Sequence, residues 1–162
     1  QYMQLFDQIW NNPEQVSDVT QAVELDRECF PNEKHSTPFK SDLLYNKMAY
    51  YLVACEADPS AASGEIIGIA GFWMMVDEAH IITIAVRNTH SRQGIGESLL
   101  SSVIDMAKQL KAREVTLEVR ESNEAAKSLY AKYGFSEMGI RKAYYDDTNE
   151  DAIIMTKEIN IL

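Results

Sequence analysis

The sequence predicts a single mixed α/β domain. Three observations indicate this class: runs rich in β-branched and aromatic residues, helical periodicity in the segments around them, and a strand–helix–strand order in the second half. The expected architecture is a central sheet with an antiparallel first half, a parallel central pair and a C-terminal hairpin, flanked by about four helices. The 162 residues, 46% of them hydrophobic, suit one domain spanning 1–162, with 1–15 as a head extension.

Two helices open the expected fold. Apolar residues recur at helical spacing from Val16 to Phe30, and Pro31 then closes the helix. Thr37 and the proline after it predict a cap and the first turn of a second short helix, which runs to about residue 46.

Three strands follow, at 50–55, 65–75 and 80–86, with a polar turn at 58–64. Their short connections predict antiparallel neighbours. A helix that begins near Gly96 leads to a strand at 115–119, and the crossover predicts that this strand runs parallel to 80–86. A helix at 123–133, stopped by Gly134, precedes a closing hairpin whose strands flank the turn at 146–149.

Charge and hydropathy exclude two classes of partner. The net charge is −10, from 25 acidic and 15 basic residues, so the basic surface that nucleic acid binding needs is missing. The longest apolar stretches, such as 66–76, are interrupted by Gly68 and Gly71 and are shorter than the roughly 20 residues of a membrane span. With no charged-then-apolar leader before Asp7, we expect a cytoplasmic protein.

The cysteines and histidines suggest no metal or redox site. Cys29 and Cys55 lie far apart in apolar settings, which predicts core thiols. His35, His80 and His90 show neither metal-ligand spacing nor a paired nucleophile. We therefore expect ordinary loop or strand histidines and no bound metal.

The segment after the third strand forms a candidate phosphate site. A strand ending at Val86, a turn containing Gly94 and Gly96, and a helix starting there bring free N–H groups and a positive helix-dipole end to one point. Arg92 adds a charge-assisted contact. Leu99 stands where the dinucleotide fingerprint has its third glycine, and no Gly-Lys-Ser/Thr follows. The turn therefore predicts a different phosphate-bearing ligand, the alternative being a plain tight turn.

From residue 81 to about 159 the chain resembles the GNAT acetyltransferases, and within them the RimI-like ribosomal-protein alanine N-acetyltransferases. The resemblance rests on the runs Ile82-Thr83-Ile84-Ala85-Val86, Gln93-Gly94-Ile95-Gly96, Leu117-Glu118-Val119-Arg120, Leu129-Tyr130, Tyr133-Gly134-Phe135 and Tyr144-Tyr145, and on the segment 150–155. It implies a GNAT-type fold over the single domain and acetyl-coenzyme A as cosubstrate.

The same resemblance implies roles for particular residues. Glu118, on the strand face opposite the valines and leucine, is the general base, and Tyr130 protonates the leaving thiolate as general acid. The implied cofactor contacts are the backbone of Ile84, Ala85 and Val86 at the pantetheine arm, the residues Arg92, Gln93, Gly94, Ile95, Gly96 and Glu97 around the pyrophosphate, and Asn123. Tyr144 and Tyr145 line the peptide slot. The structural alternatives are a salt-bridged Glu118, core packing of the tyrosines and a helix cap at Asn123.

The expected function is transfer of acetyl from acetyl-coenzyme A to the N-terminal α-amine of a protein. The resemblance implies the N-terminal alanine of a small-subunit ribosomal protein as acceptor. An α-amine is also roughly 10²-fold easier to deprotonate than lysine by reference pKa values. One alternative is a lysine or small-amine acetyltransferase on the same fold. Another is a non-catalytic coenzyme A-binding module, which would need neither Glu118 nor Tyr130.

Overall fold

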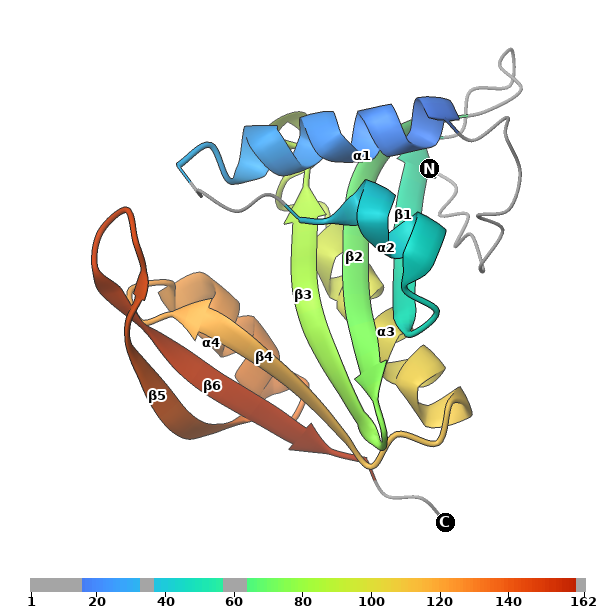
Figure 1. Ribbon diagram of the computed structural model, residues 1–162. Helices are drawn as coiled ribbons and strands as arrows, with labels where there is room; N and C mark the ends of the chain where they lie inside the picture. The colour runs from blue at the N-terminus through green and yellow to red at the C-terminus, as the bar shows by residue number, and fades with distance from the viewer. Residues whose placement is uncertain (1–15, 33–36, 57–63, 160–162) are drawn as a thin grey trace.

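The computed structural model describes residues 16–32, 37–56 and 64–159 (Figure 1). In chain order the elements are α1 (Val16–Cys29), α2 (Phe39–Tyr45), β1 (Ala49–Glu56), β2 (Glu65–Met75), β3 (Glu78–Val86), a 3₁₀ turn (Asn88–His90), α3 (Ile95–Gln109), β4 (Glu114–Arg120), α4 (Glu124–Lys132), β5 (Ser136–Tyr145) and β6 (Glu150–Glu158). The expected mixed α/β domain is confirmed. The head at 1–15 and most of the polar turn at 58–64 lie outside the described residues.

The strands form one six-stranded sheet in the order β1-β2-β3-β4-β6-β5. The pairs β1–β2 and β2–β3 are antiparallel, and β3 pairs parallel with β4, as the sequence predicts. The C-terminal hairpin is also confirmed, but β6 rather than β5 lies beside β4. The later strand of the hairpin therefore occupies the inner position.

Helices cover both faces of the sheet (Figure 1). On one face α1 and α2 bury Leu25 and Phe39 against β1 and β2. On the other face α3 buries a stripe at helical spacing against the sheet, formed by Ile95, Leu99, Leu100, Val103 and Ala107. A Cβ at Gly68 would stand 3.0 Å from side-chain carbons of Ile95 and Leu99, so the small residue in β2 allows α3 to pack this closely.

The central parallel pair is short. Residues Glu78, Ala79 and His80 pair with Glu114, Val115 and Thr116, and beyond them β3 and β4 diverge, as Figure 1 shows. β3 continues to pair with β2 up to Val86, while β4 pairs with β6 up to Arg120. Beyond His80 and Thr116, the facing edges of β3 and β4 are therefore not paired with each other.

The strand β5 contains an irregularity that carries two tyrosines. Its pairing with β6 shifts register between Arg141 and Tyr145, and Ala143 has a positive φ of 49°. Asp151 fixes this bulge, since its carboxylate accepts hydrogen bonds from the Ala143 backbone N–H and from Lys142 Nζ, both at 2.8 Å. Bulges of this kind re-aim side chains, here those at the end of β5.

One detail of the expected second helix is wrong. Thr37 does not cap α2, whose first turn has no side-chain cap. Instead, its hydroxyl and its backbone N–H donate to the carboxylate of Asp26 in α1, at 2.7 and 3.1 Å. The buried Asp26 thus ties the start of α2 to α1.

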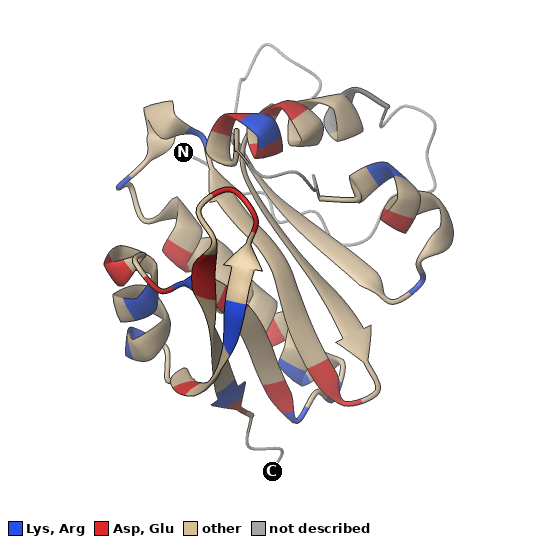
Figure 2. Ribbon diagram, turned by 60° about the vertical axis from the view of Figure 1, so that its left-hand side comes forward, with Lys and Arg blue, Asp and Glu red and all other residues tan. Residues whose placement is uncertain are grey.

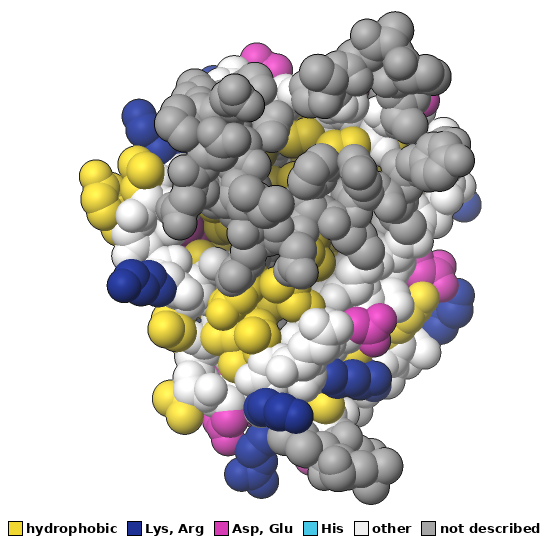
Figure 3. Space-filling model, turned by 90° about the vertical axis from the view of Figure 1, so that its right-hand side faces the viewer, with side chains coloured by type: hydrophobic (Ala, Val, Ile, Leu, Met, Phe, Trp, Pro, Cys, Tyr) yellow, Lys and Arg dark blue, Asp and Glu magenta, His cyan; other side chains and the backbone are white. Residues whose placement is uncertain are grey.

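Exposed apolar side chains gather at the β1 edge of the sheet, which Figure 3 views face on. They include Leu44, Tyr45 and Met48, at the end of α2 and in the turn after it. Charged positions lie mainly on helices, turns and strand ends, and most of the length of β1 to β3 is uncharged (Figure 2). None of the described helices is both long and apolar enough to span a bilayer.

Candidate active site

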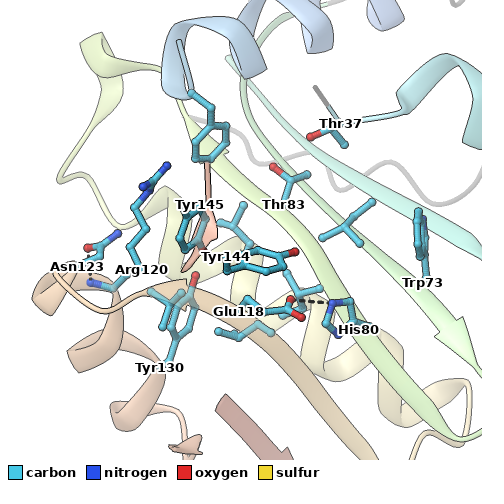
Figure 4. A pocket seen from close by; sticks show the side chains of 17 residues that line it. Thr37, Trp73, His80, Thr83, Glu118, Arg120, Asn123, Tyr130, Tyr144 and Tyr145 are labelled. Atoms are coloured by element: carbon cyan, nitrogen blue, oxygen red, sulfur yellow. Dashed lines mark hydrogen bonds and ion pairs between the residues drawn. The ribbon is translucent and has the colours of Figure 1, made fainter. Parts of the chain in front are cut away.

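A cleft of about 460 Å³ opens where β3 and β4 diverge. Its wall is built from β3, β4, the start of α4 and the end of β5, with Phe30, Thr37 and Trp73 contributed by the first half of the chain. Figure 4 shows side chains that line this space, and they come from elements distant in sequence. The cleft therefore brings together residues that become neighbours only when the chain folds.

Glu118 lies on the cleft side of β4, because Leu117 and Val119 on either side of it point into the core. Its side chain is 12% exposed. Oε2 lies 2.9 Å from His80 Nε2, and Oε1 lies 3.2 Å from Arg141 Nε. Burial acts most strongly and would raise the pKa of Glu118, but the hydrogen bond and charge of His80, with the charge of Arg141, outweigh it and lower that pKa. The carboxylate is therefore ionised at neutral pH.

Behind Glu118, a chain of contacts leads toward the surface. His80 Nδ1 lies 2.7 Å from the Thr116 hydroxyl oxygen, and that hydroxyl donates to Glu78 Oε1 at 2.7 Å. The parallel pairing of β3 with β4 sets His80 opposite Thr116 and so creates this chain. His80 is a strand residue, as expected from the sequence, but its contact with Glu118 inside the cleft was not anticipated.

Tyr130 enters the cleft from α4, and its ring packs against Phe135 with centroids 5.8 Å apart. Burial raises the pKa of Tyr130 to about 12, so the phenol keeps its proton at neutral pH. Within the described part of the chain, its hydroxyl has no hydrogen-bond partner. Figure 4 shows the hydroxyl directed into the same space as Glu118.

Two tyrosines at the end of β5 form another wall. Tyr144 and Tyr145 meet edge to face with ring centroids 5.1 Å apart, and the Arg120 guanidinium lies 3.9 Å from the Tyr145 ring centroid. The same guanidinium bonds both carboxylate oxygens of Asp147, at 3.0 and 3.1 Å. Glu150 accepts from the Ser122 backbone N–H at 2.7 Å. These contacts fix the hairpin to the loop before α4.

The predicted phosphate turn forms the start of α3, outside the cleft lining. Gly94 has φ +80° and no side chain caps the helix. The first N–H bonded within the helix is that of Ser98, which donates to the Gly94 carbonyl, so the N–H groups of the first turn point outward without helical acceptors. The Glu97 side chain turns away to bond Lys132 Nζ at 2.6 Å and the Tyr133 hydroxyl at 2.8 Å.

Six of the residues singled out from the sequence line the cleft: Ile84, Glu118, Asn123, Tyr130, Tyr144 and Tyr145. Ala85, Val86 and 92–97 do not. Asn123 caps α4 by accepting from the Ala126 N–H at 3.1 Å, and Val86 offers a carbonyl that already accepts from the Cys29 thiol at 3.2 Å. Their roles toward a cofactor stay predictions.

Sequence reasoning missed Trp73 and Thr83 as well as His80. Trp73 lines the cleft and donates through Nε1 to the buried Asp42 at 2.7 Å. Among the described residues, Thr83 Oγ1 is the only buried side-chain oxygen or nitrogen without a partner, and it belongs to the cleft wall. The described residues contain no cluster of three His, Cys, Asp or Glu arranged for a metal.

Comparison with known proteins gives consistent matches. The model of the acetyltransferase (GNAT) family matches residues 19–135. A Bacillus subtilis protein with the provisional name [ribosomal protein bS18]-alanine N-acetyltransferase is 38% identical over 145 residues, which is 90% of this chain and 92% of that protein. The crystal structure of the Escherichia coli ribosomal-protein-S18-alanine N-acetyltransferase superposes with a TM-score of 0.76 at 26% identity, covering 99% and 95% of the two chains.

A third match concerns the cofactor. A GNAT family acetyltransferase from Elizabethkingia anophelis, solved with acetyl-CoA bound, has a TM-score of 0.69 at 24% identity, and the match covers 98% of this chain and 97% of that one. At this identity the likeness concerns the fold alone.

Proposed function

Because the chain belongs to the acetyltransferase (GNAT) family, we propose that it transfers the acetyl group of acetyl-coenzyme A to the N-terminal α-amine of a protein. The main support is the cleft at the diverging strands, which holds an ionised Glu118 and a protonated Tyr130 together. A base and an acid in one cleft are what acyl transfer to an amine requires.

The residues present fit acetyl-coenzyme A. The uncapped start of α3 offers outward N–H groups and a helix dipole to a pyrophosphate, and a Cβ at Gly94 would meet no atom within 4 Å, so this backbone is open to a ligand. Among the strands of the described residues, none pairs with the edge of β3 beyond His80 on the β4 side, and this edge suits the amides of a pantetheine arm. When bound, acetyl-coenzyme A supplies an acetyl group activated as a thioester.

In this proposal the acid, the base and the aromatic wall of the cleft have separate tasks. Glu118 accepts a proton from the amine at its carboxylate. The Tyr130 hydroxyl gives its proton to the departing sulfur, and its pKa of about 12 suits a group that must stay protonated until then. The Tyr144 and Tyr145 rings, held by Arg120, form the wall against which an acceptor peptide lies.

We propose the N-terminal alanine of ribosomal protein bS18 as the acceptor, because a relative covered over 92% of its length is named for it. The chemistry of the site agrees with an α-amine. A carboxylate with a lowered pKa is a weak base, and an α-amine releases its proton roughly 10²-fold more readily than lysine does.

The test is acetyl transfer to two synthetic peptides, followed by mass spectrometry. One has a free N-terminal alanine in the bS18 sequence, and the other is the same peptide blocked at its N-terminus and carrying a free lysine. We expect acetate on the α-amine of the first peptide and none on the second. Acetate on the lysine peptide alone would replace the proposal with a lysine acetyltransferase, and coenzyme A binding without transfer to any amine would indicate a binding module.

A further inference from the structure

We propose that His80 is a proton switch for Glu118: it pairs with Glu118 as an imidazolium in the free protein and loses a proton, through Thr116 and Glu78, when a cationic amine arrives. This inference rests on the proposed function, since the amine is the acceptor of that reaction. His80 acts through Glu118 and is therefore a positioning residue.

A count of hydrogens gives the charge of His80. Three short contacts form one chain: Nε2 to Glu118 at 2.9 Å, Nδ1 to Thr116 at 2.7 Å, and Thr116 to Glu78 at 2.7 Å. Each needs one hydrogen, and carboxylates supply none. The Thr116 hydroxyl has a single hydrogen and donates it to Glu78. Both ring nitrogens of His80 must then carry hydrogen, which makes the ring an imidazolium.

The charges around the ring balance in the free protein. The anions are Glu78 on β3 and Glu118 on β4. The cations are His80 on β3 and Arg141 on β5. The Tyr130 phenol, on α4 across the cleft, is neutral. An incoming ammonium adds a third cation beside Glu118. A nearby like charge disfavours the protonated form of a cationic group.

The proton can leave by the chain of contacts. The Nδ1–H bond breaks as Thr116 Oγ1 takes the proton, the original Thr116 O–H bond breaks as Glu78 takes that hydrogen, and Glu78 passes a proton to water. Thr116 ends with one hydrogen, as it began, and no electrons are transferred between groups. The Glu78 side chain is 31% exposed against 19% for His80, so the chain ends at the solvent.

Loss of this proton prepares Glu118 for its task. The hydrogen bond and the charge of His80 are the main influences that lower the pKa of Glu118 against burial. When the charge of His80 disappears, Glu118 becomes the stronger base while the ammonium lies beside it. One ammonium proton then moves to Glu118, and the nitrogen keeps the electron pair that will bond to the acetyl carbon. The second proton, which the nitrogen loses as the amide forms, replaces the one that Tyr130 gives to the departing sulfur.

The first experiment counts protons at equilibrium. Calorimetric titration of the coenzyme A-bound protein with the free N-terminal alanine peptide, in two buffers of different ionisation enthalpy at about pH 6.5, gives the protons released. We expect up to one proton per peptide in the wild type and none with the N-acetylated peptide. His80→Gln should release none, and Thr116→Val fewer than Thr116→Ser, which keeps the hydroxyl. Equal release from wild type and His80→Gln would overturn the proposal.

Steady-state kinetics separate this role from a structural one. In the wild type, proton and peptide compete, so KM for the peptide should rise by up to about tenfold per pH unit as the pH falls, since one proton is displaced per peptide. In His80→Gln the KM should stay flat, and kcat should change less than KM. A wild-type KM profile in His80→Gln would contradict the switch.

His90 provides a matched control. It also contacts a carboxylate, Glu56 at 3.2 Å, and a threonine hydroxyl, Thr89 at 2.8 Å, but it lies outside the cleft lining. On binding the peptide, the His90→Gln variant should release as many protons as the wild type, and its KM for the peptide should depend on pH in the same way.

NMR of the histidine ring nitrogens in the free protein tests the switch without substrate. We expect hydrogen on both ring nitrogens of His80 near neutral pH. Hydrogen on one ring nitrogen alone would overturn the proposal. If no peptide is bound or acetylated, the proposed function fails, and the ring spectra still decide the state of His80. If His80→Gln does not fold, the comparison of Thr116→Val with Thr116→Ser remains.

Discussion

Replacement of Asp42 by alanine should destabilise the protein by about 3 kcal/mol. The Asp42 carboxylate, 6% exposed, accepts from the Tyr51 hydroxyl at 2.6 Å, from Trp73 Nε1 at 2.7 Å and from Asn46 Nδ2 at 3.2 Å. Hydrogen bonds to a charged group contribute about 1.5–3 kcal/mol each, so the two shorter ones give about 3–6 kcal/mol. Removal of a buried charge offsets part of that loss.

The assay is urea unfolding followed by circular dichroism, compared at an unchanged m value. Asp77→Ala is the matched control, because within the described part of the chain that exposed carboxylate makes a 3.7 Å surface contact with Arg113 and no other, and it should contribute less than about 1 kcal/mol. A loss below about 1 kcal/mol for Asp42→Ala would refute the reasoning, since it would mean that the buried donors find other partners.

The same cluster predicts a dependence on alkaline pH. Burial, followed by the hydrogen bond and charge of Asp42, raises the pKa of Tyr51 far above its ordinary value. A group with a raised folded pKa stabilises fully below its unfolded pKa of about 10, and that contribution is lost as the pH rises further. Unfolding free energies should therefore fall above about pH 10 in the wild type and less steeply in Tyr51→Phe.

Three other substitutions test the cleft and the α3 turn. Glu118→Gln should lower kcat about 10²- to 10⁴-fold in the peptide assay, whereas Glu114→Gln, on the same strand but outside the cleft, should leave it unchanged; equal rates would exclude Glu118 as the base. Tyr130→Phe should lower kcat about 10²-fold without weakening coenzyme A binding in calorimetry. Gly94→Ala should lower the free energy of unfolding in urea by about 1 kcal/mol, because alanine is strained at a φ of +80°. No atom lies near the added carbon, so backbone strain is the whole cost, and an unchanged free energy would exclude it.

Local signals in the sequence were sufficient for most elements. The bounds of β2 agree with the prediction at both ends, and α3 follows its apolar stripe. Glu118 was found because strand alternation puts it on the face away from Leu117 and Val119. Such signals depend on spacing within one segment, which the sequence displays directly.

What the sequence could not give depends on register between distant segments. The position of β6 between β4 and β5 follows from strand pairing that no local pattern encodes. His80 and Glu118 are 38 residues apart, and only the pairing of His80 with Thr116 brings them together. The two predicted parallel strands begin at residues 80 and 115, which would set His80 opposite Val115, whereas the observed partner of His80 is Thr116. The predicted strand ends therefore did not give this contact.

The brief pairing of β3 with β4 also bears on how the protein unfolds. Three residue pairs join β1–β3 to β4–β6, whereas each neighbouring antiparallel ladder runs for at least six pairs. Sub-global opening follows the boundary that breaks the fewest interactions. Amide hydrogen exchange should therefore reveal two cooperative units meeting at residues 78–80 and 114–116, and a ligand that bridges the strands should merge them into one.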